Sequence, residues 1–434
     1  MNQKDQQILK IALPAIVTNI TVPLLGLVDT AIVGHMGDAA YIGAIAVGSM
    51  IFSLVYWMFA FLRMGSSGMT AQARGRRDMQ DVMRLLMRSL TVSLIISLSV
   101  IILQYPLREM MLWFIGPTED VRLLASTYFN IVVWGTPAVL GLYSLSGWYI
   151  GMQNSRTPML ISIIQNIINI CASLWLVYGM GMKVEGVALG TVIAQYTSLL
   201  VAVALWLHFY HRLLHWKILL TKERLADWLV FFRVNRDIFL RTFFLVAVNL
   251  YFTSAGARQG AVILAVNTLL MQLYLFFSYF MDGFAYAGEA LGGRYWGARN
   301  MDAFRTVVRR LFVWGAAMVV LFTSMYVIGG MPFLRLLTDE PYVVEASRDY
   351  VWWAYLIPLA GAAAFVWDGV FIGITATRGM LLSACISAGA FFVGVVCLMG
   401  WMGNHGLWLS MIFFLAMRGL VQTLLYQRTI PKSC

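Results

Sequence analysis

The chain has 434 residues, of which 60% are hydrophobic and 12% charged, and its formal net charge is +11. Apolar runs of about twenty residues recur along it, which is the length that crosses the apolar core of a bilayer. The basic residues are spread over short connections, so the charge indicates membrane loops and no nucleic-acid surface. This composition excludes a water-soluble globular protein.

The apolar runs predict an all-α integral membrane protein with twelve transmembrane helices. The helices are expected at residues 8–34, 41–71, 84–105, 123–151, 158–179, 185–209, 236–257, 262–291, 304–329, 345–375, 379–400 and 405–427. No small-residue cleavage site follows the first run, so it is expected to be a retained helix and not a signal peptide. The four cysteines show no metal-type pair spacing, and we expect no metal site.

Loop charges predict the orientation of these helices. With a cytoplasmic N-terminus, basic clusters such as Arg74, Arg76 and Arg77 fall on the cytoplasmic side. The few basic loop residues expected outside are Arg108, Arg122, Lys183, Arg258, Arg335 and Arg348. Because positive charge is retained in the cytoplasm, both termini are predicted to be cytoplasmic.

The sequence also repeats itself at an offset of 222 residues. At this offset the following pairs match: Gly34 and Gly256, Gly75 and Gly297, Arg77 and Arg299, Arg88 and Arg310, Tyr128 and Tyr350, and Gly151 and Gly373. The register predicts two pseudo-symmetric, parallel six-helix lobes. We expect an N-lobe at 1–210, a cytoplasmic linker at 211–235 and a C-lobe at 236–434, with a substrate cavity between the lobes.

Within the first predicted helix, Asp29 lies about one turn from the outer end, with Pro14 earlier in the helix. Burial disfavours a charged carboxylate, so a buried aspartate can exchange protons near neutral pH. Proline removes a helical hydrogen bond and marks a point where the helix can bend. Asp29 is therefore a candidate coupling site, and the alternative is a helix-end aspartate that faces external water.

Polar residues in the fifth and sixth predicted helices are candidates to surround Asp29. They are Asn166, Asn169 and Ser173 in one helix and Thr191 and Gln195 in the other. Asn169 and Ser173 are four residues apart, as are Thr191 and Gln195, so each pair shares a helix face. These side chains could hydrogen-bond Asp29, or they could join helices without a role in transport.

Three further acids lie inside predicted spans of the C-lobe. Asp282 and Glu289 are seven residues apart in the eighth helix, and Asp368 lies in the tenth. They could bind a cation or a cationic substrate, or they could neutralise buried basic groups such as Arg63 or Arg418. The sequence leaves both alternatives open.

The run from Pro23 to His35, PLLGLVDTAIVGH, preceded by Leu13-Pro14-Ala15, resembles the first helix of multidrug and toxic compound extrusion (MATE) transporters, in particular their DinF branch. The segments DGFAYA from Asp282 and DGVFIG from Asp368 extend the resemblance over the chain. It implies a two-lobed bacterial inner-membrane antiporter that expels organic, often cationic, amphipathic compounds against inward flow of protons or sodium ions.

The resemblance also implies roles for individual residues. Asp29 matches the N-lobe proton site, Pro14 the proline near which the first helix bends, and Asn169 and Thr191 two members of the polar cluster. Similar proteins have a second aspartate where this chain has Ser173. Loss of that carboxylate favours protons over sodium ions, because a sodium ion loses attraction when fewer anionic oxygens surround it. Asp368 matches an aspartate implicated in cation coupling in sodium-driven relatives, so sodium remains an alternative.

We therefore expect a monomeric efflux antiporter, with no cofactor other than the coupling ion and with membrane lipid around it. A lipid or lipid-linked-precursor flippase is the alternative, and it predicts a strongly basic central cavity. An intramembrane enzyme is not expected, because no histidine lies well inside a predicted span.

Overall fold

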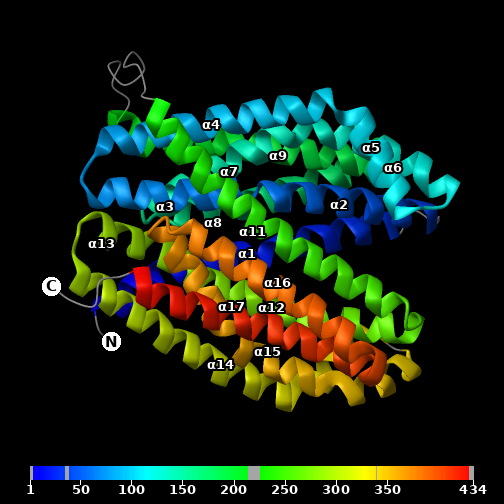
Figure 1. The fold of residues 1–434 in the computed structure, drawn as a ribbon. Coiled ribbons are helices and arrows are strands. Elements are labelled where there is room, and N and C mark those ends of the chain that lie inside the picture. The colour runs from blue at the N-terminus through cyan, green and yellow to red at the C-terminus, as the bar shows by residue number, and fades with distance from the viewer. Residues whose placement is uncertain (1–2, 35–38, 214–224, 339, 430–434) are drawn as a thin grey trace. The chain divides into compact units, whose positions relative to one another are not determined.

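The computed structural model describes residues 3–34, 39–213, 225–338 and 340–429, and every regular element in these ranges is a helix (Figure 1). Contacts divide the chain into two compact units. The N-terminal unit is Val17–Phe231, and the C-terminal unit is Met1–Ile16 together with Phe232–Cys434. Helix α1 (Gln3–Gly34) contributes its first half to the C-terminal unit, whereas the sequence analysis placed all of it in the N-lobe.

In the N-terminal unit, α7 packs on α3, α4 and α9, while α2 packs on α6 and α8 on α9. The helices of this unit after α1 are α2 (Ala39–Phe59), α3 (Phe61–Gly75), α4 (Met79–Ile102), α5 (Gln104–Ile115), α6 (Glu119–Val132), η1 (Val133–Gly135), α7 (Thr136–Gly151), α8 (Arg156–Leu174), η2 (Trp175–Gly179), α9 (Val184–Tyr210) and η3 (His211–Leu213). A proline in the first turn of α7 favours a helix start there.

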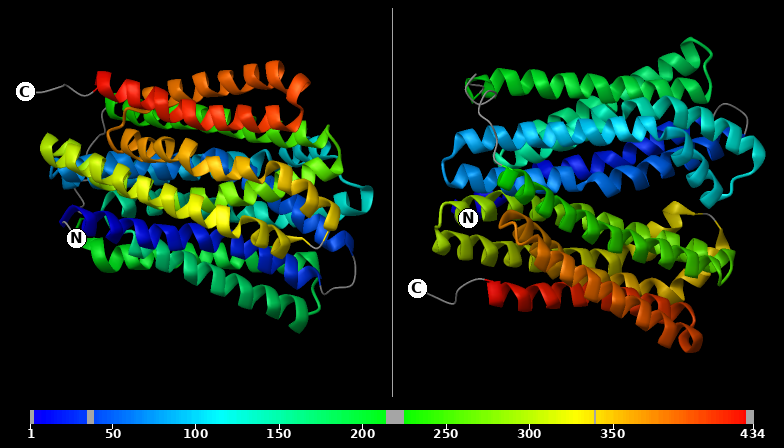
Figure 2. Two further views of the ribbon diagram at one scale, coloured as in Figure 1. Left: turned by 90° about the horizontal axis from the view of Figure 1, so that it is seen from below. Right: turned by 45° about the horizontal axis from the view of Figure 1, so that its top comes forward.

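In the C-terminal unit, α15 is the central helix and packs on α12, α14 and α17. The helices are α11 (Leu225–Ala257), α12 (Ala261–Ala287), η4 (Gly288–Gly292), α13 (Gly293–Gly297), α14 (Met301–Leu337), α15 (Pro341–Gly373), α16 (Thr377–Met402) and α17 (Asn404–Thr429). Figure 2 shows α14, α15 and α17 running alongside one another. α15 also begins with a proline, Pro341.

Helix bounds repeat at the offset found in the sequence. The pair α2–α3 occupies 39–75 and the run α12–α13 occupies 261–297, a difference of 222 at both ends. The run α6–α7 at 119–151 and α15 at 341–373 differ by the same number. Each unit therefore follows one helical plan.

Unusual backbone positions repeat as well. Four non-glycine residues have positive φ among the described residues: Arg77 (62°) and Arg299 (55°), and Gln153 (58°) and Thr375 (55°). Both pairs are 222 residues apart. Left-handed backbone is uncommon for residues with a side chain, so its recurrence in one register confirms the predicted repeat.

Two equivalent glycines allow helices to approach closely in each unit. A Cβ on Gly147 would lie 2.2 Å from the carbonyl oxygen of Arg63, and a Cβ on Gly369 would lie 2.2 Å from that of Ala285. Small residues at such crossings are typical of membrane helix pairs. The crossing of α7 with α3 is thus repeated by α15 with α12.

Eleven helical segments of the described chain are long and apolar enough to cross a membrane. α1 is not among them, although its 32 residues extend about 48 Å, more than a bilayer core of roughly 30 Å. The all-helical membrane class is confirmed. The twelfth span and the cytoplasmic termini stay predictions.

Two helix assignments from the sequence were wrong. α11 begins at Leu225 and not at 236, and α5 was missed. Both segments are rich in charge and resemble loops, but their charges are paired. Asp227 lies 3.6 Å from Arg88, and Glu109 in α5 lies 2.9 Å from Arg122. The rest of the predicted linker, 214–224, lies outside the described residues.

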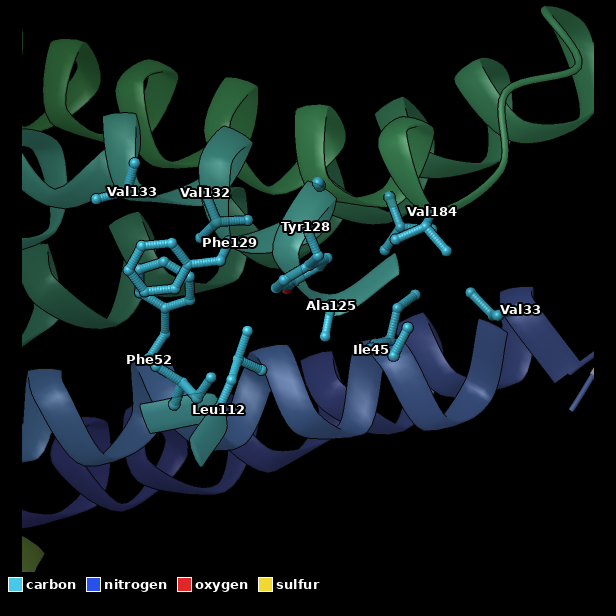
Figure 3. Close-up of a cluster of buried hydrophobic side chains, with 14 of the residues drawn as sticks. Val33, Ile45, Phe52, Leu112, Ala125, Tyr128, Phe129, Val132, Val133 and Val184 are labelled. Carbon is cyan, nitrogen blue, oxygen red and sulfur yellow. The ribbon is translucent and has the colours of Figure 1, made fainter. Parts of the chain in front are cut away.

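A buried hydrophobic cluster holds the end of α1 in the N-terminal unit. Ile32 and Val33 of α1 join Ile45 of α2, Tyr128 of α6 and Val184 of α9 in this cluster. Figure 3 shows the Tyr128 side chain among these residues, with the stacked rings of Phe52 and Phe129 farther along. The cluster therefore places the segment after Asp29 against α2, α6 and α9.

Candidate functional site

Asp29 lies inside the N-terminal unit, five residues before α1 ends, and only 4% of it is exposed. Its burial in this unit disagrees with a helix-end aspartate that faces water. Asp29 interacts electrostatically with Tyr128 of α6, which also shares a hydrogen bond with Thr191 of α9. The aspartate thus belongs to a polar group that extends from α1 to α6 and α9.

Asn169 of α8 joins this group through a direct hydrogen bond. Its Nδ2 donates to Thr191 Oγ1 at 3.1 Å, and Thr191 Oγ1 donates to the carbonyl of Val187 at 3.0 Å. The close approach of α8 and α9 depends on Gly190, where a Cβ would lie 2.4 Å from Ser173 Oγ. We name Asp29, Tyr128, Asn169, Ser173, Thr191 and Gln195 the Asp29 cluster.

Several oxygens of the Asp29 cluster have no hydrogen-bond partner among the described residues. They are Asp29 Oδ1, Asn169 Oδ1, Ser173 Oγ and Gln195 Oε1. Buried polar atoms are nearly always hydrogen-bonded, because an unmade bond is costly away from water. Three of the four atoms can only accept. The cluster is therefore short of donors, and a proton or a cation would satisfy it.

The Asp29 cluster has no polar counterpart in the other repeat. At an offset of 222, Asp29 corresponds to Tyr251, Asn169 to Phe391 and Thr191 to Phe413. Ser173 and Gln195 correspond to Val395 and Met417. Tyr251 packs edge-on against the ring of Phe391 at 6.2 Å. The same fold is therefore stable with an apolar cluster here, which indicates that the polar residues are not required for folding.

Two other predicted residues of the N-lobe lie elsewhere on α1. Asn166 Nδ2 donates to the carbonyl of Thr21 at 2.8 Å, and Thr21 Oγ1 bonds Ser162 Oγ at 2.9 Å, so Asn166 joins α8 to the middle of α1. Pro14 lies within α1, which continues as a helix through it. The change from one unit to the other, between Ile16 and Val17, follows closely after Pro14.

In the C-terminal unit, Asp368 of α15 pairs with two arginines. Its Oδ2 accepts from Arg241 of α11 and, at 2.6 Å, from Arg418 of α17, while its Oδ1 accepts from Gln422 at 2.6 Å. All four side chains are buried. Of the two alternatives left open by the sequence, this geometry supports neutralisation of a buried basic group.

The other two acids of the C-terminal unit differ in position. Asp282 of α12 is half-buried and interacts electrostatically with Arg241. Glu289 is 1% exposed and lies in η4, a π-helical segment of five residues. A π-helix changes the angular register, so the spacing of seven residues does not by itself place both acids on one face.

Sequence reasoning missed Tyr128, Arg241 and Gln422. Arg241 was taken to lie near a helix start, but α11 begins sixteen residues earlier, at Leu225. Gln422 lies four residues after Arg418 on α17, a spacing that could have indicated a shared face. Tyr128 was noted only as part of the repeat.

A duplicated bundle of membrane-spanning helices, with buried ionisable groups inside each unit, defines a secondary transporter. The MatE family model matches residues 14–175 and 238–397, which is most of the chain. The chain belongs to the MATE family of transporters, which are not enzymes.

Individual proteins of this family are similar over nearly the whole chain. DNA damage-inducible protein F of Escherichia coli (strain K12) is 36% identical, over 99% of this chain and 93% of its own length. A probable multidrug resistance protein NorM of Acinetobacter baylyi is 23% identical, over 94% and 92%. A crystal structure of a MATE protein in its bent conformation has a TM-score of 0.88 at 18% identity, over 99% and 96%. This last similarity shows the fold alone.

Proposed function

We propose that the chain exports organic, amphipathic and often cationic compounds in exchange for protons, and that Asp29 is the coupling carboxylate. The supporting observation is the buried Asp29 cluster, whose oxygens lack donors among the described residues. Protonation would turn Asp29 from an acceptor into a donor. The cluster therefore gains a hydrogen bond when the proton arrives and carries a negative charge when it leaves.

The composition of the cluster favours a proton over a sodium ion. Asp29 is the only carboxylate of the six residues in the cluster, since Ser173 stands where similar transporters have a second aspartate. One carboxylate attracts a sodium ion less than two would in a low-dielectric site. A proton needs only one oxygen, because it forms a covalent bond.

Asp29 in its charged form would favour binding of a cationic substrate, and protonation from outside would release it. Exchange requires that proton and substrate oppose each other's binding, and this coupling is reciprocal. Pro14 would be the bending point of α1. Its ring removes the N–H that would bond Lys10 and so weakens the helix just before α1 passes into the N-terminal unit.

The setting we propose is a monomer in a bacterial inner membrane with both termini in the cytoplasm, which follows the positions of the basic loops. A flippase remains the alternative. The buried arginines of the C-terminal unit would suit a lipid phosphate, but Asp368 pairs with both of them. This pairing supports the antiporter over the flippase.

The test is efflux of a fluorescent organic cation from proteoliposomes under an imposed proton gradient or an imposed sodium gradient. We expect the wild type to respond to the proton gradient alone. Asp29→Asn is expected to lose at least tenfold in rate, and Asp29→Glu, which keeps a carboxyl group, is expected to retain part of it. Normal proton-driven efflux by Asp29→Asn would remove the central claim.

A further inference from the structure

The charges inside the C-terminal unit are arranged around one carboxylate. Asp368 is 6% exposed, Arg241 7%, Arg418 3% and Gln422 1%. Both oxygens of Asp368 accept hydrogen bonds: Oδ2 from the two guanidinium groups and Oδ1 from the Gln422 amide. Three helices, α11, α15 and α17, supply these side chains. We name the four residues the Asp368 network.

The Asp368 network is absent from the other repeat. Arg241 corresponds to Asn19, Asp368 to Ser146, Arg418 to Tyr196 and Gln422 to Leu200 at the offset of 222. None of these four counterparts is charged. Since the N-terminal unit forms the same helical plan without the network, the fold does not require it. Burying three charges is costly, which points to a role beyond packing.

The network leaves an added cation little attraction to Asp368. A metal cation binds a carboxylate through its negative charge and its lone pairs. Here two positive groups already surround one negative group, and Asp282, which interacts with Arg241, brings the local charge only to balance. In a low-dielectric interior, repulsion from two guanidinium groups acts strongly on an approaching ion.

We propose that Arg241 and Arg418 are built-in cations that hold the position of a coupling ion at Asp368, so that the C-terminal unit binds no sodium. The two arginines thereby determine the ion selectivity of this unit. The inference deepens the proposed function and rests on it in one respect, namely that the chain is driven by an ion. Asp29 takes no part in it.

Removal of one guanidinium group should therefore create a sodium site. Without Arg418, Asp368 Oδ2 would retain a single charged partner. Gln422 Oε1 has no hydrogen-bond partner among the described residues and would supply a second oxygen. Carboxylate and carbonyl oxygens are the ligands that hard cations prefer.

The test is thermal unfolding of the purified full chain in sodium chloride and in potassium chloride at equal ionic strength. Wild type is expected to unfold at the same temperature in both salts. Arg418→Met is expected to unfold about 2 °C or more higher in sodium, because a ligand bound only to the folded state stabilises it. The double variant Arg418→Met/Asp368→Asn is expected to lose this difference.

Two variants control for charge and for packing. Arg418→Lys keeps a tethered cation and is expected to show no sodium effect. Arg348→Met removes an exposed arginine of α15 that pairs with Glu345, and it too is expected to show none. Arg241→Met provides a second route to the same gain of sodium binding if Arg418→Met does not fold.

The proposal is overturned if wild type is stabilised by sodium and Asp368→Asn is not. It is also overturned if folded Arg418→Met unfolds at one temperature in both salts. If neither arginine variant folds, the comparison of wild type with Asp368→Asn decides alone. A sodium effect in wild type that disappears in Asp29→Asn contradicts the proton coupling proposed for Asp29 and leaves the Asp368 network to be decided by the arginine variants.

Discussion

Asp29 and Tyr251 occupy the same position in the two repeats, 222 residues apart, yet one is a buried carboxylate and the other packs against phenylalanine rings. The difference extends to every residue we compared around them. Two units built on one helical plan have thus acquired different interiors. This asymmetry is the reason to expect proton exchange in the N-terminal unit and not in the C-terminal unit.

Substrate binding should depend on pH through Asp29. Because a proton and a cationic substrate compete for the charged carboxylate, affinity is expected to fall as pH falls, by up to about tenfold per pH unit. Asp29→Asn should bind with one affinity across the range. The measurement is titration of a fluorescent organic cation into detergent-solubilised protein from pH 5 to 9.

The control for this titration is Tyr251→Phe, which changes the equivalent position of the C-terminal unit and keeps its aromatic packing. It should preserve the pH dependence of wild type. An unchanged pH dependence in Asp29→Asn would show that another group exchanges the proton.

Thr191→Val should weaken coupling without unfolding the protein. The change removes the oxygen that accepts from Asn169 Nδ2 and leaves that buried donor without its partner, at a cost of about 1–3 kcal/mol. We expect a several-fold lower rate of proton-driven efflux. Thr197→Val is the matched control on α9, since the Thr197 hydroxyl bonds only the Ile193 carbonyl of its own helix at 2.7 Å. Equal rates for the two variants would contradict a role for Thr191.

The sequence predicted much of this architecture for a simple physical reason. A bilayer requires long apolar helices, so apolar runs locate them, and the match of Arg77 with Arg299 reflects a real backbone conformation, left-handed in both units. Asp29 could be found because a carboxylate in an apolar run needs an explanation.

What the sequence could not give was the pairing between helices. Arg241 looked like an interfacial residue because the segment before it carries Asp227 and Arg236, although the helix includes both. Its partner Asp368 is 127 residues away, and no local pattern shows which helices meet. Helix bounds misled for the same reason, since paired charges look like loop charges until their partners are known.

Gly147→Ala and Gly369→Ala should destabilise the protein to similar extents. In each variant the new methyl group would lie 2.2 Å from a carbonyl oxygen of the facing helix, so the helices must move apart. Overpacking of this kind costs about 1–3 kcal/mol. Gly389→Ala in α16 is the control, because a Cβ there meets nothing within 4 Å. Thermal unfolding measures all three, and a neutral effect in only one of the first two would contradict equivalent crossings.

Pro14→Ala should slow transport while leaving substrate binding intact. Alanine restores the N–H that proline lacks and with it the helical hydrogen bond, which stiffens α1 next to the boundary between the units. We expect efflux to fall several-fold and binding at high pH to stay unchanged. Leu13→Ala, an exposed neighbour, is the control. Wild-type efflux by Pro14→Ala would place the bending point elsewhere.

Asp368→Asn should destabilise the protein more than the loss of the whole charge pair does. The single change leaves Arg241 and Arg418 buried without their carboxylate, and an uncompensated buried charge costs about 3–5 kcal/mol. Asp368→Asn/Arg418→Gln removes one positive charge as well and should recover part of the loss. The measurement is a double-mutant cycle by thermal unfolding, completed with Arg418→Gln. If the losses of the two single variants simply add, Asp368 and Arg418 do not depend on each other and the pairing has no energetic importance.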